Sequence, residues 1–102
     1  MSSSLRIDTK IQRESEEIAY VVDSSNWGTS PSGVLVSAVV WDGSTWSDVS
    51  ANILEGSASV DGNEITTPVV KNLVAGKAYR IMILFSAGGM VYEPFLEIHV
   101  EE

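Results

Sequence analysis

The sequence predicts an all-β fold, an antiparallel β-sandwich of about seven strands. Three observations support this prediction. Short runs of β-branched and aromatic residues recur along the 102 residues. Glycine, asparagine, aspartate and proline clusters separate these runs, and no long stretch repeats with the helical period. We expect one sandwich domain over residues 5–102, preceded by a flexible N-terminal arm at residues 1–4.

The first quarter of the chain predicts two strands. Residues Leu5–Gln12 alternate between apolar and polar and predict an edge strand whose apolar side carries Leu5, Ile7, Thr9 and Ile11. The charged run Arg13–Glu17 predicts a connector or a single helical turn. The run Ile18–Val22 predicts a strong strand, and Asp23–Gly33 predicts a loop.

The middle of the chain predicts a central strand. Residues Val34–Trp41 are almost all apolar, which is typical of a strand covered on both faces, and we expect Trp41 to lie in the core. Asp42-Gly43-Ser44 predicts a turn, so Trp46 is expected in a loop. The alternation in Val49–Leu54 predicts a further strand.

Two more strands are predicted at Ser57–Val60 and Glu64–Val70, joined by a turn at Asp61-Gly62-Asn63. Within the second of these, Ile65 and Thr67 share one side. Because proline has no amide hydrogen, Pro68 predicts either an edge strand or the end of pairing.

A long hairpin is predicted to close the domain. Its strands are Ala78–Phe85 and Met90–Val100, and its turn is Gly88-Gly89, where both residues tolerate a positive φ. Alternating side chains predict a buried side comprising Tyr79, Ile81, Ile83, Phe85, Leu96, Ile98 and Val100. Pro94 predicts a bulge or a crossing between sheet edges.

Residues Leu73–Tyr79 have the Leu-x-x-Gly-x-x-Tyr spacing of a tyrosine corner. In that motif the tyrosine hydroxyl bonds to main chain a few residues upstream, at the start of the penultimate strand. This spacing and the strand count together favour an immunoglobulin-like or fibronectin type III-like sandwich.

The composition limits the possible functions. The net charge is −8 and the isoelectric point is near 4.4, so the surface repels phosphate backbones and argues against nucleic-acid binding. No apolar run approaches the length of a membrane span, and the first residues lack the pattern of a secretory signal. The chain has no cysteine, which removes disulfides and thiolate metal sites and fits a reducing compartment.

No residue pattern predicts a reaction. The single histidine, His99, is expected on the polar face of the last strand, solvated between Glu97 and Glu101. Four carboxylates lie in or beside turns, where they are typical turn formers: Asp42, Asp48, Asp61 and Glu64. We therefore predict no catalytic, cofactor-binding or metal-binding residues, and a protein that is not an enzyme.

Two loop tryptophans, Trp27 and Trp46, are the candidate partner or ligand contacts. An exposed tryptophan can stack on a sugar or anchor a protein interface. The alternative is that both indoles fold over the end of the sandwich.

Two stretches resemble bacteriophage structural proteins of the fibre–tail adaptor type. The first, Ile18–Trp27, resembles their first strand and a tryptophan-bearing turn. The second, Ala75–Glu93 with the alternating strand after it, resembles their closing hairpin, whereas Val34–Leu54 departs from the pattern by being longer and more apolar. The resemblance implies a non-enzymatic immunoglobulin-like protein of the virion, assembled in the host cytoplasm. It would dock onto tail, neck or capsid in multiple copies through contacts with other virion proteins.

Three alternatives stay open at this point. A carbohydrate-binding module would use Trp27 and Trp46 as its platform. A capsid decoration or cement protein would share the virion location but not the position. An adhesion or spacer domain of a longer surface protein would suit the serine-rich start.

Overall fold

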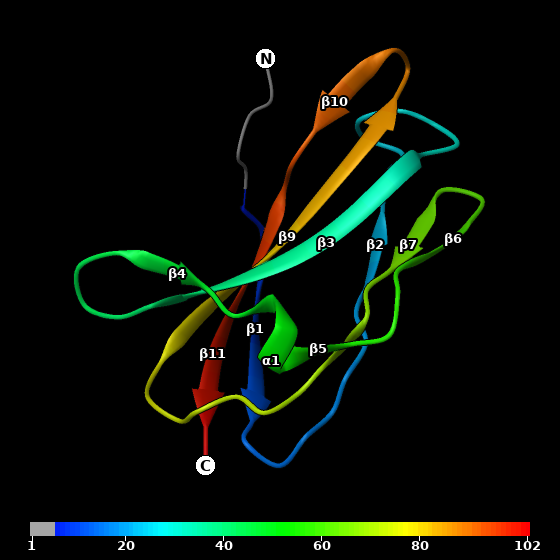
Figure 1. Ribbon diagram of the computed structural model, residues 1–102. Helices are drawn as coiled ribbons and strands as arrows, with labels where there is room; N and C mark the ends of the chain where they lie inside the picture. Colours follow the sequence, from blue (N-terminus) through cyan, green and yellow to red (C-terminus); the bar gives the residue numbers. More distant parts are fainter. Residues whose placement is uncertain (1–5) are drawn as a thin grey trace.

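The computed structural model describes residues 6–102, and in that part of the chain the structure is almost entirely β (Figure 1). The all-β prediction is therefore confirmed, while the predicted arm 1–4 and Leu5 lie outside the described residues. The elements in chain order are β1 (Arg6–Arg13), β2 (Val21–Asp23), β3 (Ser32–Trp41), β4 (Trp46–Asp48), α1 (Ser50–Ile53), β5 (Leu54–Glu55), β6 (Ser59–Asp61), β7 (Glu64–Thr66), β8 (Val69–Val70), β9 (Ala78–Ala87), β10 (Met90–Tyr92) and β11 (Phe95–Glu101).

The main sheet has the strand order β1-β11-β9-β3-β4, and β10 pairs with β9 in line with β11. Its pairs are antiparallel except β1 with β11, which run parallel. The prediction of a purely antiparallel sheet was thus wrong at one edge. No short turn links β1 to β11, so nothing imposes the antiparallel direction on that pair.

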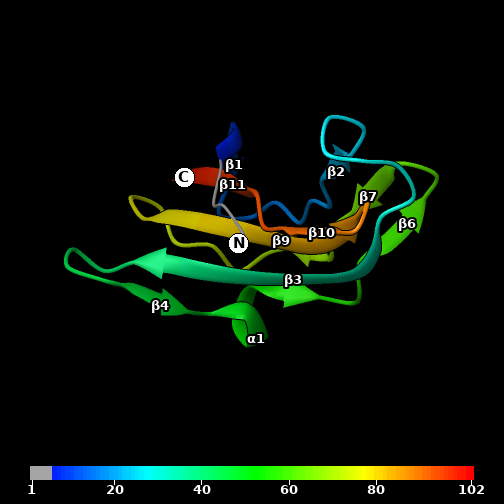
Figure 2. The ribbon, with the colours of Figure 1, turned by 90° about the horizontal axis from the view of Figure 1, so that it is seen from above.

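A second layer covers one face of the main sheet. It consists of the three-stranded sheet β2-β7-β6 and the two-stranded sheet β5-β8, linked by a bridge between Ile18 and Val70. Side chains of both layers form one core, in which Val22, Ile65 and Val70 join Ile81, Ile83 and Phe85. In Figures 1 and 2 the β6–β7 hairpin and the β3–β4 hairpin project at opposite sides of the molecule.

The closing hairpin is confirmed. Gly88 and Gly89 have φ angles of +59° and +80°, and Ala87 pairs with Met90 across them. The pairing with β9 keeps one register on both sides of Glu93-Pro94, because Tyr92 faces Phe85 and Phe95 faces Met82. The bulge or crossing predicted at Pro94 was therefore wrong: Pro94 only interrupts the ladder, and its carbonyl still accepts from the Ile83 amide at 2.9 Å.

The hydrogen bond predicted by the tyrosine spacing is also present. The Val74 amide donates to the Tyr79 hydroxyl at 3.1 Å, and Tyr79 is buried at the start of β9. The bond ties the segment before β9 to the main sheet.

Strand β1 faces the core with its polar side. A register shift between Arg6 and Asp8 turns the strand over, so Ile11 is 64% exposed and Gln12 is fully buried. Gln12 donates to the carbonyls of Glu16 and Val70 and accepts from the Tyr20 hydroxyl, which satisfies its buried amide. The predicted common apolar side of Ile7, Thr9 and Ile11 was wrong because the sequence does not reveal this bulge.

Four other predicted strands are changed. Within Val49–Leu54, residues Ser50–Ile53 form α1, because Asp48 accepts from the Ser50 amide and the Ile53 amide donates to the Val49 carbonyl. The predicted strand Glu64–Val70 divides into β7 and β8, so pairing ends at Pro68 as its missing amide allows. The predicted strands Ile18–Val22 and Ser57–Val60 are shorter or shifted, at β2 and β6.

Strand β3 is covered on one face only. Ala38 and Val40 are buried, but Leu35 on the opposite face is 67% exposed and Trp41 is 40% exposed. The predictions of a doubly covered strand and of a core Trp41 were wrong, and Trp46 lies in β4 rather than in a loop. Within residues 6–102 no second layer covers that face. Strand β4 pairs with the edge of β3, so it widens the sheet without covering either face.

In the described part of the chain, α1 has four residues, and no helix is long and apolar enough to cross a membrane.

Candidate functional site

The candidate site is the outer face of the main sheet, the face turned away from the second layer. Side chains alternate along a strand, so the residues between the buried ones of β9 point outward. Pairing places them in rows across the sheet. The row Asp48-Val39-Arg80-Glu97-Thr9 is paired throughout. Next to it, at the end of the β3–β9 ladder, the pair Trp46-Trp41 lies beside the row Ala78-His99-Ile11.

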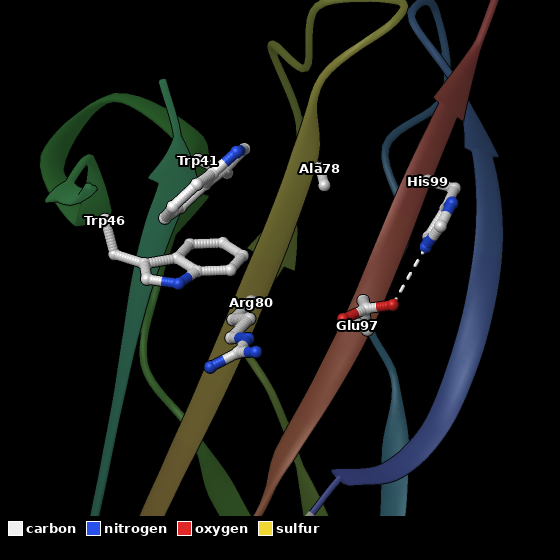
Figure 3. Close-up of a pocket in the computed structure, with 6 residues that line it drawn as sticks. All are labelled: Trp41, Trp46, Ala78, Arg80, Glu97 and His99. Atoms are coloured by element: carbon white, nitrogen blue, oxygen red, sulfur yellow. Dashed lines mark hydrogen bonds and ion pairs between the residues drawn. The ribbon is translucent and has the colours of Figure 1, made fainter. Parts of the chain in front are cut away.

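These two rows contain a hollow of about 350 Å³ on the sheet surface. Its lining residues come from four strands and are Trp41, Trp46, Ala78, Arg80, Glu97 and His99. Figure 3 shows the two indoles on one side of the hollow, Glu97 and His99 on the other, and Arg80 beside Trp46. We call these residues, without Ala78, the aromatic half of the outer face.

The two indoles are neighbours because Trp41 and Trp46 pair directly across the β3–β4 hairpin. Their ring centroids are 5.3 Å apart and the planes are tilted by 54°. The turn is held by Asp42, whose carboxylate accepts from the amides of Ser44 and Thr45, both at 2.9 Å. These backbone bonds lower the pKa of Asp42, and they give this carboxylate a structural role in the turn.

Arg80 is fixed in the floor of the hollow by two aromatic rings. Its guanidinium carbon lies 4.3 Å from the ring centroid of Trp46 and 4.4 Å from that of Phe95. Such stacking is favourable for a planar cation and leaves it little rotational freedom. Among residues 6–102 the buried Nε atom has no hydrogen-bond partner, and the contacts that hold this side chain there are the two stacked rings.

Glu97 is the acidic group of the hollow. Its Oε2 lies 2.9 Å from Nε2 of His99 and 3.6 Å from the Arg6 guanidinium, and the side chain is mostly buried. The hydrogen bond with His99 is the largest cause that lowers the pKa of Glu97, and the charges of Arg6 and Arg80 act in the same direction. Glu97 is therefore ionised near neutral pH, and its charge offsets that of Arg80.

The remaining outer rows of residues 6–102 carry no charged pair, and on β3, β9 and β10 they consist of apolar side chains and serines. Leu35 pairs with Leu84, Ser37 pairs with Met82, and Val91 pairs with Ser86. Leu35 and Val91 are exposed, while Met82 and Leu84 are half-buried between them. We call Leu35, Met82, Leu84 and Val91 the apolar half of the outer face.

A second hollow of about 290 Å³ adjoins the apolar half at the edge of β3. Val34, Leu35 and Val36 form one wall, and Gly56–Ala58 with Pro68 form the other. Strand β4 reaches only Val39–Trp41, so the earlier part of β3 pairs on one side alone within the described residues. A partner that covers Leu35 thus also meets a strand edge.

The two tryptophans predicted as contacts lie on opposite faces of the main sheet. Trp46 belongs to the outer face, whereas Trp27 packs edge-on against the inner residue Phe85, with ring centroids 6.0 Å apart. Gly28 lets this loop approach β9, since a Cβ there would lie 2.8 Å from that of Ala87. Trp27 and Trp46 therefore do not form one surface, and the neighbour of Trp46 is Trp41.

Sequence reasoning missed Trp41, Arg80 and Glu97 as parts of one site. The signal for Trp41 was available: Val36, Ala38 and Val40 alternate toward the core, so Trp41 must point outward. The predicted alternation leaves Arg80 and Glu97 opposite the buried side chains of their strands, but only the register between β9 and β11 brings them together.

The four turn carboxylates do not converge. Asp42 and Asp48 accept hydrogen bonds from main-chain amides of their own turns. Asp61 and Glu64 are opposite residues of the separate β6–β7 hairpin. Within residues 6–102, no group of three or more histidine, aspartate and glutamate side chains is placed to hold a metal ion. The aromatic half thus offers stacking and hydrogen bonding to a ligand.

No protein-family model matches this chain, and no curated protein or solved structure matches it either.

Proposed function

We propose that this chain is a non-enzymatic immunoglobulin-like structural module of a bacteriophage particle. It docks onto another virion protein through the apolar half of its outer sheet face. The observation that carries the proposal is the uncovered row of apolar side chains headed by Leu35, which is 67% exposed beside Leu84. Contiguous exposed apolar surface on a soluble protein is typical of interaction sites.

Three features support the immunoglobulin-like part of the proposal. The order β11-β9-β3-β4 corresponds to strands G, F, C and C′ of variable-type domains, and β2-β7-β6 corresponds to B, E and D. The hydroxyl of Tyr79 accepts from the Val74 amide at the start of β9, where these domains have their tyrosine corner. The chain departs from the variable-type pattern between β4 and β6, where α1 and β5 stand in place of a longer strand.

The resemblance of Ile18–Trp27 and Ala75–Glu93 to fibre–tail adaptor proteins supports the virion location. The charge of the chain supports a particular kind of partner. With a net charge of −8, free copies repel one another, and a partner with a basic rim around an apolar centre attracts them. In an assembly of many copies, each copy would use the same face.

The apolar half is suited to be the centre of such an interface. Its four named side chains carry no charge, so burying them brings hydrophobic gain without the desolvation penalty of an ion. The free edge of β3 beside Leu35 adds main-chain donors and acceptors that a partner strand can pair with.

The test is incorporation of the Leu35→Glu variant into particles of the bacteriophage that encodes the chain. Leu35 is already exposed, so the substitution leaves the fold intact but places a charge in the interface. The matched control is Val60→Glu, another exposed apolar residue of a strand, on β6 of the second layer. Incorporation is measured by immunoblotting of purified particles, and the position by electron microscopy with antibody labelling.

We expect particles to contain the wild-type chain and the Val60→Glu control, and at least tenfold less of Leu35→Glu. Label at the tail or neck supports the adaptor role, and label spread over the capsid supports the decoration role instead. Equal incorporation of all three chains contradicts docking through the apolar half, and particles without the wild-type chain contradict the virion role.

A further inference from the structure

We infer that the hollow of the aromatic half binds a neutral sugar ring of a polysaccharide. This goes beyond the proposed docking function, because it assigns a ligand to a different part of the outer face. The hollow is lined by Trp41, Trp46, Arg80, Glu97 and His99, and the docking surface is centred on Leu35. The argument has three steps: the stacking surface, the hydrogen-bonding groups and the charge balance.

The stacking surface is provided by Trp41 and braced by Trp46. Trp41 is 40% exposed on a face with no second layer in the described residues. Trp46 touches Trp41 on one side and Arg80 on the other, which fixes both indoles relative to the sheet. The electron-rich face of an indole attracts the C–H groups on one side of a sugar ring, so a fixed, open indole is a suitable platform.

The hydrogen-bonding groups lie around the hollow: Glu97 and His99 stand across it from the indoles, and Arg80 lies beside Trp46 (Figure 3). Glu97 offers carboxylate oxygens that accept from hydroxyl groups, and the guanidinium of Arg80 offers N–H donors. His99, tied to Glu97 at 2.9 Å, offers a further ring nitrogen and has an exposed side chain. A ring stacked on Trp41 thus meets both acceptors and donors at its hydroxyl groups.

The charges of the lining select a neutral ligand. Arg80 and Glu97 carry opposite charges in the same row, Asp48 ends that row, and the Arg6 guanidinium lies 3.6 Å from Glu97. These two positive and two negative groups balance, so neither an anion nor a cation finds a complementary net charge there. A phosphate or sulfate group would approach Glu97 in a chain of net charge −8, and an ammonium group would approach Arg80. Neutral hydroxyl groups can donate to Glu97 and accept from Arg80 without bringing like charges together.

The location suits a polymer rather than a small free sugar. The hollow of about 350 Å³ lies on the sheet surface and not in the interior. Ile11, 64% exposed at the β1 end of the same row, extends the track beyond His99. A chain of sugars can therefore continue across the face.

The three tryptophans allow a direct test by nuclear magnetic resonance, because each gives one indole N–H signal. The ¹⁵N-labelled full chain is titrated separately with cellohexaose, chitohexaose and maltohexaose. We expect at least one of them to shift the signals of Trp41 and Trp46 while that of Trp27, which packs against Phe85 on the inner side, stays in place. Single tryptophan-to-phenylalanine variants assign the three signals.

Two variants sharpen the test. Trp41→Ala removes the stacking surface at an exposed position and should weaken binding at least tenfold, with the Trp27 signal reporting an intact fold. Leu35→Glu alters the docking surface only and should bind the oligosaccharide as the wild type does. Loss of particle incorporation in Leu35→Glu together with retained sugar binding would separate the two sites.

The inference is overturned if none of the three oligosaccharides shifts the signals of Trp41 and Trp46, or if Trp41→Ala binds as tightly as the wild type. It is equally overturned if only a polyanion, dextran sulfate, produces the shifts, because the lining would then select charge. Either failure leaves the Leu35 docking experiment unaffected, so the two proposals fail independently.

Discussion

The inner and outer faces of the main sheet are built from alternate residues of the same strands, and they differ sharply. On the inner face of β9, Ile81, Ile83 and Phe85 are fully buried and join the core of the second layer. On the outer face of the same strand, Arg80, Met82 and Leu84 remain half-exposed. The comparison shows that alternation along β9 places one set of side chains in the core and leaves the other on the uncovered face.

The outer face is itself divided. Its apolar half surrounds Leu35 and Leu84, whereas its aromatic half brings the indoles of Trp41 and Trp46 together with Arg80, Glu97 and His99. In the aromatic half, ring stacking and a hydrogen bond join the side chains to one another. The apolar half is made of aliphatic side chains and Met82, which have neither aromatic rings nor hydrogen-bond donors.

The largest expected effect tests the contrast between the two faces. Ile83→Ala removes buried methyl groups from the inner face and should lower the free energy of unfolding by about 2–5 kcal/mol. Leu35→Ala on the outer face should change it by less than about 0.5 kcal/mol. Urea unfolding measures both, and equal effects would contradict the assignment of the two faces.

The next largest effect concerns the bond that ties the core-facing Tyr79 to the upstream segment. Tyr79→Phe keeps the ring but deprives the Val74 amide of its acceptor, and should cost about 1–2 kcal/mol. Urea unfolding is again the measurement. Tyr92→Phe is the matched control, because that hydroxyl is exposed. An equal loss of stability in both variants would contradict a stabilising role for the bond between Val74 and Tyr79.

A smaller effect is expected in the floor of the aromatic half. Arg80→Leu keeps an apolar side chain but loses both cation–π contacts, and should lower the free energy of unfolding by about 1 kcal/mol. Arg80→Lys retains the charge without the planar group and should recover only part of that loss. Full stability in Arg80→Leu would show that stacking does not hold the hollow together.

The smallest effect is a pH dependence at Glu97. Its pKa is lowered in the folded state, first through the hydrogen bond with His99 and then through the charges of Arg6 and Arg80. The unfolded chain therefore binds the proton more tightly, so this stabilisation is present near neutral pH and is lost as the pH falls through the folded-state pKa.

Glu97→Gln should accordingly show a smaller drop in unfolding free energy between about pH 7 and about pH 4 than the wild type. Glu101→Gln, at an exposed position of the same strand, is the control and should retain the wild-type drop. An unchanged drop in Glu97→Gln would contradict the conclusion that the groups around the Glu97 carboxylate stabilise the folded state.

Sequence reasoning succeeded where the local signal was strong. The glycine pair at Gly88-Gly89, the tyrosine spacing before β9 and the alternation of β11 each specify their structure through a few neighbouring residues. It failed at Val34–Trp41, because an apolar run does not distinguish a strand covered on both faces from one whose second face is left uncovered, as it is within residues 6–102.

The sequence by itself determined that this protein is all-β, where its closing hairpin turns, and which side of β9 and β11 is buried. Turn chemistry and side-chain alternation act between near neighbours and can be read along the chain. Only the tertiary structure decided that β1 runs parallel to β11 with Gln12 inward, and that Trp41, Arg80 and Glu97 meet in one hollow. Those outcomes depend on strand register, which is fixed by packing between segments far apart in the sequence.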